Sequence, residues 1–177
     1  MDNAIAEERV RKRFAKWDAD GSGSLEKADL EMEAAQIARA FGQDLGSPQV
    51  RELTDAFSAM FDHLGQESGV GSDGALTEDQ FVAATGAMIA EGSERTFDGV
   101  LGPVMRGIVA LCDRNADGQI NRDEWAAWMN GVGVDEAQAR VAFDQVDKNG
   151  NGELSVDELL GAVRDYHYGR LDVELLG

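Results

Sequence analysis

Four segments of twelve residues in this chain follow one pattern, and this internal repeat constrains the fold more than any other feature of the sequence. The segments are 18–29, 69–80, 113–124 and 147–158. Each has glycine at its sixth position, an aliphatic residue at its eighth, and an acid or amide at its twelfth. Glycine carries no Cβ and therefore permits a sharp turn of the backbone. Four aligned copies predict four equivalent turns, each placed between two elements of regular structure.

The sequence between these turns is helical. Ile5, Val10, Phe14 and Trp17 form an apolar stripe at three- to five-residue spacing, which is typical of an amphipathic helix. Comparable stripes flank the other turns. No run of residues alternates convincingly at the period of two that a half-buried strand requires. We therefore predict an all-α fold with eight helices.

The third and fourth turns carry the oxygen atoms that a calcium ion needs. Calcium takes about six to eight oxygen ligands in flexible geometry, and a twelve-residue loop supplies them from positions one, three, five, seven and twelve. In the third turn these positions hold Asp113, Asn115, Asp117, the carbonyl of Gln119, and Glu124. In the fourth they hold Asp147, Asn149, Asn151, the carbonyl of Glu153, and Glu158. Both turns are predicted to bind calcium.

The first turn has the same layout with one departure. Its oxygen donors are Asp18, Asp20, Ser22, the carbonyl of Ser24, Glu26 and Asp29. Asp29 stands at position twelve and is one methylene shorter than glutamate, so we expect it to bind through one oxygen unless the next helix moves inward. Lower coordination favours magnesium, which prefers near-octahedral geometry. Glu26 is placed to compensate by reaching the metal directly. We predict a third calcium site at which Mg²⁺ competes.

The second turn lacks these donors. Gly69 and Gly71 offer no side-chain oxygen at positions one and three, and Gln80 replaces the carboxylate at position twelve. Thr77 and Gln80 match a capping box instead, in which two side chains satisfy free N–H groups at a helix start and no metal is needed. Asp73 alone is too little to replace the hydration shell of a divalent ion. We predict a purely structural turn here.

Capping is also an alternative for the other turns, because Ser155 and Glu158 form a similar pair. Capping does not require the further oxygen atoms at positions one, three and five, so the metal interpretation is favoured for three of the four turns. The aliphatic residue at position eight points away from the metal. We expect these residues to meet in pairs across neighbouring turns, as Leu25 with Leu76 and Ile120 with Leu154.

The charge of the chain limits the classes of molecule that it is expected to bind. Thirty-four acidic and sixteen basic side chains give a formal net charge of -18, which disfavours binding to nucleic acid and to anionic membranes. Cys112 is the single cysteine, so a disulfide within the chain is impossible, and we expect this thiol to be a small buried side chain. The first residues do not resemble a signal peptide, and no stretch is apolar enough to span a membrane. We expect a cytoplasmic protein.

Several stretches together carry a family resemblance: GVGSDG at 69–74, LGPV at 101–104, NADGQIN at 115–121 and GRLDVELLG at 169–177. With three complete turns around a silent second one, the whole chain resembles the calerythrin family of prokaryotic EF-hand proteins, which are related to the invertebrate sarcoplasmic calcium-binding proteins. The resemblance implies four EF-hands in two pairs, residues 1–92 and 93–177, folded as one compact globular unit. It also implies calcium buffering or transport.

A calcium sensor that binds a target protein or helix is the main alternative function. A sensor exposes a methionine-rich groove when calcium binds, whereas here single methionines are scattered at Met32, Met60, Met88, Met105 and Met129. Tail residues Leu171, Val173, Leu175 and Leu176 are placed to pack on the core and cover a groove. We therefore favour a monomeric buffer.

Catalysis is not expected. Coelenterazine-binding photoproteins also combine a silent second loop with three active ones, but this chain has only His63 and His167 and ends in glycine. We expect His167 to lie at an amphipathic helix end. Because the loop carboxylates repel one another, we also expect folding to be coupled to metal binding.

Overall fold

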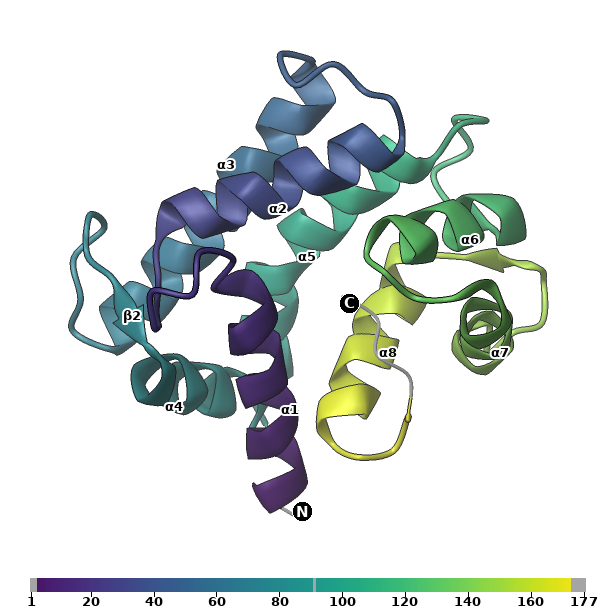
Figure 1. The fold of residues 1–177 in the computed structure, drawn as a ribbon. Coiled ribbons are helices and arrows are strands. Elements are labelled where there is room, and N and C mark those ends of the chain that lie inside the picture. Colours follow the sequence, from purple (N-terminus) through teal and green to yellow (C-terminus); the bar gives the residue numbers. More distant parts are fainter. Residues whose placement is uncertain (1–2, 91, 173–177) are drawn as a thin grey trace.

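The computed structural model describes residues 3–90 and 92–172, and the prediction of eight helices is confirmed within these ranges (Figure 1). The helices are α1 (Asn3–Trp17), α2 (Lys27–Ala40), α3 (Pro48–Glu67), α4 (Glu78–Ile89), α5 (Glu94–Cys112), α6 (Arg122–Gly131), α7 (Glu136–Val146) and α8 (Val156–His167). Local signals start several of them. Ser47 accepts a hydrogen bond from the Val50 N–H (3.3 Å), and Pro48 follows as the first helical residue.

The four turns meet in pairs through very short strands. Strand β1 (Ser24–Leu25) pairs antiparallel with β2 (Leu76–Thr77), and β3 (Ile120–Asn121) pairs antiparallel with β4 (Glu153–Leu154). The registers place Leu25 opposite Leu76 and Ile120 opposite Leu154, and all four side chains are fully buried. The predicted pairing of the position-eight residues is therefore confirmed.

Helix α5 runs through the middle of the molecule and joins the two pairs (Figure 1). It packs along α3 on one side and against α8 on the other, while α2 contacts α6. Glycines allow two of these close approaches. A Cβ at Gly107 of α5 would lie 3.1 Å from the Cα of Leu53, and one at Gly131 would lie 2.5 Å from the Cβ of Ala40. One hydrophobic core extends through both halves.

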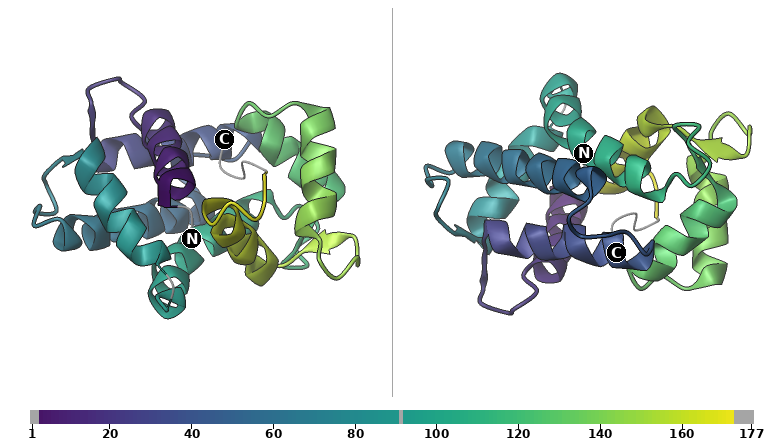
Figure 2. Two further views of the ribbon diagram at one scale, coloured as in Figure 1. Left: turned by 90° about the horizontal axis from the view of Figure 1, so that it is seen from below. Right: turned by 90° about the horizontal axis from the view of Figure 1, so that it is seen from above.

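The end of α8 is attached to the beginning of the chain. The Arg9 guanidinium donates to the carbonyls of Tyr166 and Leu171, the latter at 2.7 Å, and forms an ion pair with Asp172 at 3.1 Å. The Tyr168 hydroxyl donates to the carbonyl of Ile89 at 2.5 Å. Figure 2 shows the resulting arrangement from two further sides, with α1 beside α8. The tail residues Val173, Leu175 and Leu176 lie outside the described residues.

Candidate metal-binding loops

The first loop gathers three carboxylates. One oxygen from each of Asp18, Asp20 and Asp29 lies within 4.8 Å of the other two. Backbone N–H groups hold them: Asp18 accepts from Ser22 and Gly23, both at 2.9 Å, and Asp29, which is only 4% exposed, accepts from Glu26 at 2.8 Å. The structure therefore assembles a cluster of negative charge at the predicted positions one, three and twelve.

Hydrogen bonding favours the charged form of one of these carboxylates, Asp20. The Ser22 N–H donates to Asp20 at 2.9 Å, and this hydrogen bond lowers the pKa of the Asp20 carboxyl below its ordinary value. Ser22 also donates its hydroxyl to the carbonyl of Ser24 at 2.9 Å. Glu26 is exposed and is not part of the three-carboxylate cluster. The structure thus brings together most of the predicted donors of the first loop but leaves Glu26 at its edge.

The third loop is closed by its first and last residues. Asp113 accepts hydrogen bonds from the N–H groups of Asp117 (3.2 Å) and Gly118 (2.7 Å), and Asp117 accepts from Gln119 (2.9 Å). Glu124 is almost completely buried, and its two oxygens accept from the N–H groups of Arg114 (2.7 Å) and Asn121 (3.0 Å). The carboxylate at position twelve therefore reaches back to the beginning of the loop.

Asn115 completes this group. Its amide nitrogen lies 2.6 Å from Asp117, so the side chains of positions three and five are in direct contact. Hydrogen bonds thus link Asp117 to both Asp113 and Asn115, while Glu124 accepts from the N–H of Arg114.

The fourth loop repeats this arrangement. Asp147 accepts from the N–H groups of Gly150 and Gly152, both at 2.9 Å. Glu158 accepts from the Ser155 N–H at 3.1 Å and from the amide of Asn149 at 2.7 Å. Asn151 at position five accepts from the N–H of Glu153 at 2.9 Å, as Asp117 does from Gln119 in the third loop.

The third and fourth loops are linked by side chains as well as by strands. The Gln119 amide donates to Glu153 at 2.9 Å. Sequence reasoning used only the backbone carbonyls of these two residues and missed this contact, because both stand at position seven and their proximity arises from the β3–β4 pairing. The contact joins the two loops directly.

The second loop forms a turn by other means. Gln80 accepts from the Thr77 N–H at 3.0 Å and Thr77 accepts from the Gln80 N–H at 3.4 Å, as predicted for a capping box. Gly69 at position one has φ +68°, while Gly74 at position six does not have positive φ. The other three loops reverse this: their sixth residues Gly23, Gly118 and Gly152 have φ between +80° and +85°.

Two predictions about side chains outside the loops are confirmed. Cys112 is buried as expected, and desolvation raises the pKa of its thiol far above the ordinary value. His167 is the last residue of α8, as expected for an amphipathic helix end, and it is buried because α8 is covered on this side by α1 and α5. Four of the five scattered methionines fill the core, and Met32 is exposed.

The paired helix–loop–helix units and the acidic loops define a calcium-binding protein of the EF-hand type. Models of this family match residues 112–129, described as an EF hand, and residues 138–171, described as an EF-hand domain. The chain is 59% identical over 177 residues to calerythrin from Saccharopolyspora erythraea, covering 100% of both chains. The chain belongs to the calerythrin family.

Solved structures agree with this fold. A Streptomyces coelicolor calcium-binding protein, described in connection with prokaryotic calcium-mediated regulation, matches 92% of this chain and 97% of its own, with a TM-score of 0.76 and 23% identity. Magnesium-loaded apo-berovin, a ctenophore photoprotein, matches 90% of this chain and 87% of its own, with a TM-score of 0.70 and 23% identity. Among the described residues, no helix has the length and apolar character needed to cross a membrane.

Proposed function

We propose that this protein binds three calcium ions through its first, third and fourth loops and serves as a cytoplasmic calcium buffer. The observation that carries the proposal is the convergence of Asp18, Asp20 and Asp29 within 4.8 Å. Like charges at this distance repel one another, and a divalent cation offsets the repulsion. The third and fourth loops support it with oxygen-bearing side chains at the same positions, and Glu124 and Glu158 reach back toward the loop entrance.

Metal binding in these loops is proposed to be coupled to folding. A ligand that binds only the folded state stabilises it by RT ln(1 + [L]/Kd). For one site this contributes about 2.7 kcal/mol when the free ion is at 100 times its Kd. Three such sites would therefore supply a large part of the stability of an ordinary domain, about 5–15 kcal/mol.

We also propose that Mg²⁺ competes at the first loop. Asp29 accepts the Glu26 N–H and, being shorter than glutamate, offers fewer oxygens to a large ion. The relative berovin supports this expectation, since its three calcium-binding loops all bind magnesium ions. Mg²⁺ at cytoplasmic concentrations would then lower the calcium affinity of the first loop more than that of the other two.

A buffer role is favoured over a sensor role by the distribution of apolar side chains. Met60, Met88, Met105 and Met129 are buried, so they do not form an open groove. The large exposed apolar residues lie on separate parts of the fold: Ile5, Met32, Leu45 and Val141. The alternative, a sensor, requires a target helix that binds only in the presence of calcium, and a calcium-dependent pull-down tests it.

We infer the domain organisation from the same contacts. The EF-hand pair of residues 1–92 and the pair of residues 93–177 would fold as one monomeric unit, because α5 and the shared core connect them. We propose that the C-terminal tail packs on the core. The anchoring of Leu171 and Asp172 by Arg9 supports this placement.

Calorimetric titration of the chelated protein with Ca²⁺, repeated in the presence of Mg²⁺, tests the proposal. We expect three ions per chain, and Mg²⁺ should weaken one of the three binding steps most. The double variant Ser72→Ala with Asp73→Ala, in the silent loop, should leave the number of ions at three. A stoichiometry of two or fewer, or a melting temperature that is the same with calcium and with chelator, would refute it.

A further inference from the structure

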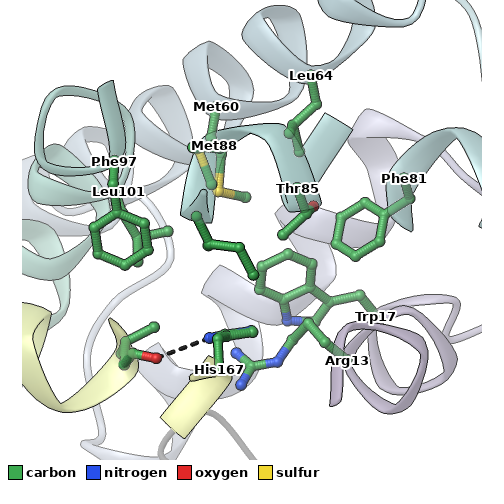
Figure 3. A pocket seen from close by; sticks show the side chains of 12 residues that line it. Arg13, Trp17, Met60, Leu64, Phe81, Thr85, Met88, Phe97, Leu101 and His167 are labelled. Carbon is green, nitrogen blue, oxygen red and sulfur yellow. Dashed lines mark hydrogen bonds between the residues drawn. The ribbon is translucent and has the colours of Figure 1, made fainter. Parts of the chain in front are cut away.

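Two reactive side chains in the core of this protein are shielded from solvent. Cys112 is fully buried. His167 lies in the wall of a cavity between α1, α3, α4, α5 and α8 (Figure 3). This cavity has a volume of about 30 Å³, which is room for about one or two water molecules. Chemistry that needs free contact with water is therefore to be sought at the surface, and the fourth loop offers it.

Two asparagines of the fourth loop are each followed by glycine, as Asn149–Gly150 and Asn151–Gly152, and both asparagines are exposed. The backbone nitrogen of the next residue can attack the side-chain carbonyl of an asparagine, which makes asparagine one of the thermolabile residues. The attack is easiest when that residue is glycine, because no Cβ stands in the way and the backbone is freest to turn. These two pairs are therefore open to deamidation, a covalent change that consumes only water.

Deamidation at such a pair has two steps. The glycine nitrogen loses its proton and bonds to the asparagine Cγ, while the Cγ–Nδ2 bond breaks and the amide nitrogen leaves as ammonia with that proton. Water then adds to one of the two carbonyls of the resulting five-membered imide and breaks its bond to the glycine nitrogen. Opening at the side-chain carbonyl leaves aspartate. Opening at the backbone carbonyl leaves isoaspartate, in which the chain runs through the side chain and is longer by one carbon.

The closed fourth loop holds these groups away from reaction. The N–H groups of Gly150 and Gly152 both donate to Asp147, each at 2.9 Å. The two attacking nitrogens therefore face a carboxylate, whose negative charge disfavours loss of their protons. The amide of Asn149 donates to Glu158 at 2.7 Å, which retains the group that would leave. The reaction accordingly requires the loop to open.

Opening is expected when no metal is bound. The acidic side chains of this one loop, Asp147, Glu153 and Glu158, repel one another without a cation between them. Ligand-binding loops also belong to the parts of a fold that open locally at low cost. A bound cation would hold Asp147 and Glu158 in place and keep the loop closed, and this protection by calcium rests on the proposed function.

Two asparagines elsewhere meet only part of these conditions. Asn115 occupies position three of the third loop and is exposed, and its amide donates to Asp117 at 2.6 Å, but Ala116 follows it and presents a Cβ. Asn130 is followed by glycine, but both residues lie in α6. The helical backbone directs the N–H of each residue toward the carbonyl four residues before it, away from the preceding side chain. Only the fourth loop combines an exposed asparagine, a following glycine and a backbone outside a helix.

We propose that Asn149 and Asn151 form a modification site at which the fourth loop deamidates spontaneously while it is free of metal. The isoaspartate product adds a carbon to the chain between Asp147 and Glu158. Positions one and twelve would then lose the spacing that lets both reach one ion. The modification would remove the fourth loop from calcium binding, and no enzyme is needed for it.

Ageing of the chelated protein, followed by digestion with trypsin and mass spectrometry, tests the site. The digest separates residues 149–164, with both fourth-loop pairs, from residues 115–122, with Asn115, and residues 123–140, with Asn130. We expect residues 149–164 to exchange an amide for an acid roughly tenfold faster than the other two peptides, because only there is a glycine nitrogen free to attack. Equal rates in residues 149–164 and 115–122 would overturn the proposal.

Calcium titration of the aged protein tests the consequence. Aged wild type should bind one ion fewer than fresh wild type. The double variant Asn149→Ser with Asn151→Ser has no amide to lose at these positions, so its number of bound ions should be the same before and after ageing. Aged wild type that is modified at these residues and still binds as many ions as fresh protein would contradict the loss of the fourth site.

Ageing in saturating calcium separates this proposal from the proposed function. Calcium should slow the modification of residues 149–164 and leave the slow rates of the other two peptides as they are. Fast modification of residues 149–164 at the same rate with calcium and with chelator would support the modification site and refute calcium binding by the fourth loop.

Discussion

The second and third loops show that a turn can persist without its metal ligands. Both have a capping box at the start of the following helix, and both contribute a short strand with a fully buried aliphatic residue, Leu76 or Ile120. The third loop presents side-chain oxygens at all three of positions one, three and five, whereas the second loop presents one only at position five, from Asp73. The turn is thus maintained by hydrogen bonds and apolar pairing, whereas the proposed binding site depends on a separate set of side chains.

The backbones of the two loops also differ. Gly69 has positive φ at position one, where the third loop has Asp113 at φ -70°. Gly74 is needed for a different reason than Gly118: a Cβ there would come within 2.3 Å of the Val70 side chain. The silent loop is therefore a distinct turn and more than a binding loop with missing side chains.

The prediction with the largest expected effect concerns position twelve of the two loops. Glu124→Gln removes a carboxylate from the third loop, and we expect calcium affinity there to fall roughly 100-fold, about 3 kcal/mol. Gln80→Glu is the matched change in the second loop and should add no site. Calorimetric titration measures both. A gain of a fourth ion in Gln80→Glu would mean that the two loops differ only in ligands.

The stability of the protein is expected to depend on pH through His167 as well as through loss of metal from the loops, and the two effects have to be measured separately. The pKa of His167 is lowered to about 4 by burial, from an ordinary value of 6.5. The unfolded chain therefore binds a proton that the folded chain does not, and stability is lost as the pH falls from about 6.5 to about 4. The loss reaches at most about 3 kcal/mol.

The variant His167→Gln should lack the part of the acid-induced loss of stability that comes from His167. Denaturant unfolding in saturating calcium gives the change in unfolding free energy between pH 7 and pH 5 for each protein, and the difference between the two proteins is the contribution of His167. His63→Gln serves as the control for a partly exposed histidine. Identical pH dependence of the wild type and His167→Gln would show that the loops alone account for the acid sensitivity.

A complete set of ligands should still fail to activate the second loop. Gly69→Asp, Gly71→Asp and Gln80→Glu together restore acids at positions one, three and twelve. Because position one has φ +68°, aspartate there is strained, and we expect a loss of about 1–2 kcal/mol in stability with chelator present. The number of bound ions should remain three. Four ions bound with high affinity would show that the backbone readily adopts the other conformation.

The smallest expected effect concerns position four. Ala116 of the third loop has φ +60°, while Gly21 and Gly150 occupy the same position in the other two loops at +68° and +69°. Ala116→Gly relieves this strain and should raise the unfolding free energy of the calcium-free protein by about 1 kcal/mol. Gly150→Ala should lower it by a similar amount. If the two changes have the same sign, strain at this position is not the cause.

Much of this protein follows from local sequence. The helices, the four turns, the paired aliphatic residues and the capping boxes were all predictable, because each depends on residues close together in the chain. The candidate ligands were assigned from local sequence as well, because a twelve-residue loop places its donors by spacing alone, and their binding of metal stays a prediction.

Only the tertiary structure decided how the hands are combined. It places α5 between the two pairs, anchors the end of α8 through Arg9, and buries His167. It also leaves Val141 of α7 57% exposed, while Ala142 and Phe143 beside it are buried. These features depend on contacts between residues far apart in the chain, and apolar periodicity indicates that a face is buried without indicating which partner covers it.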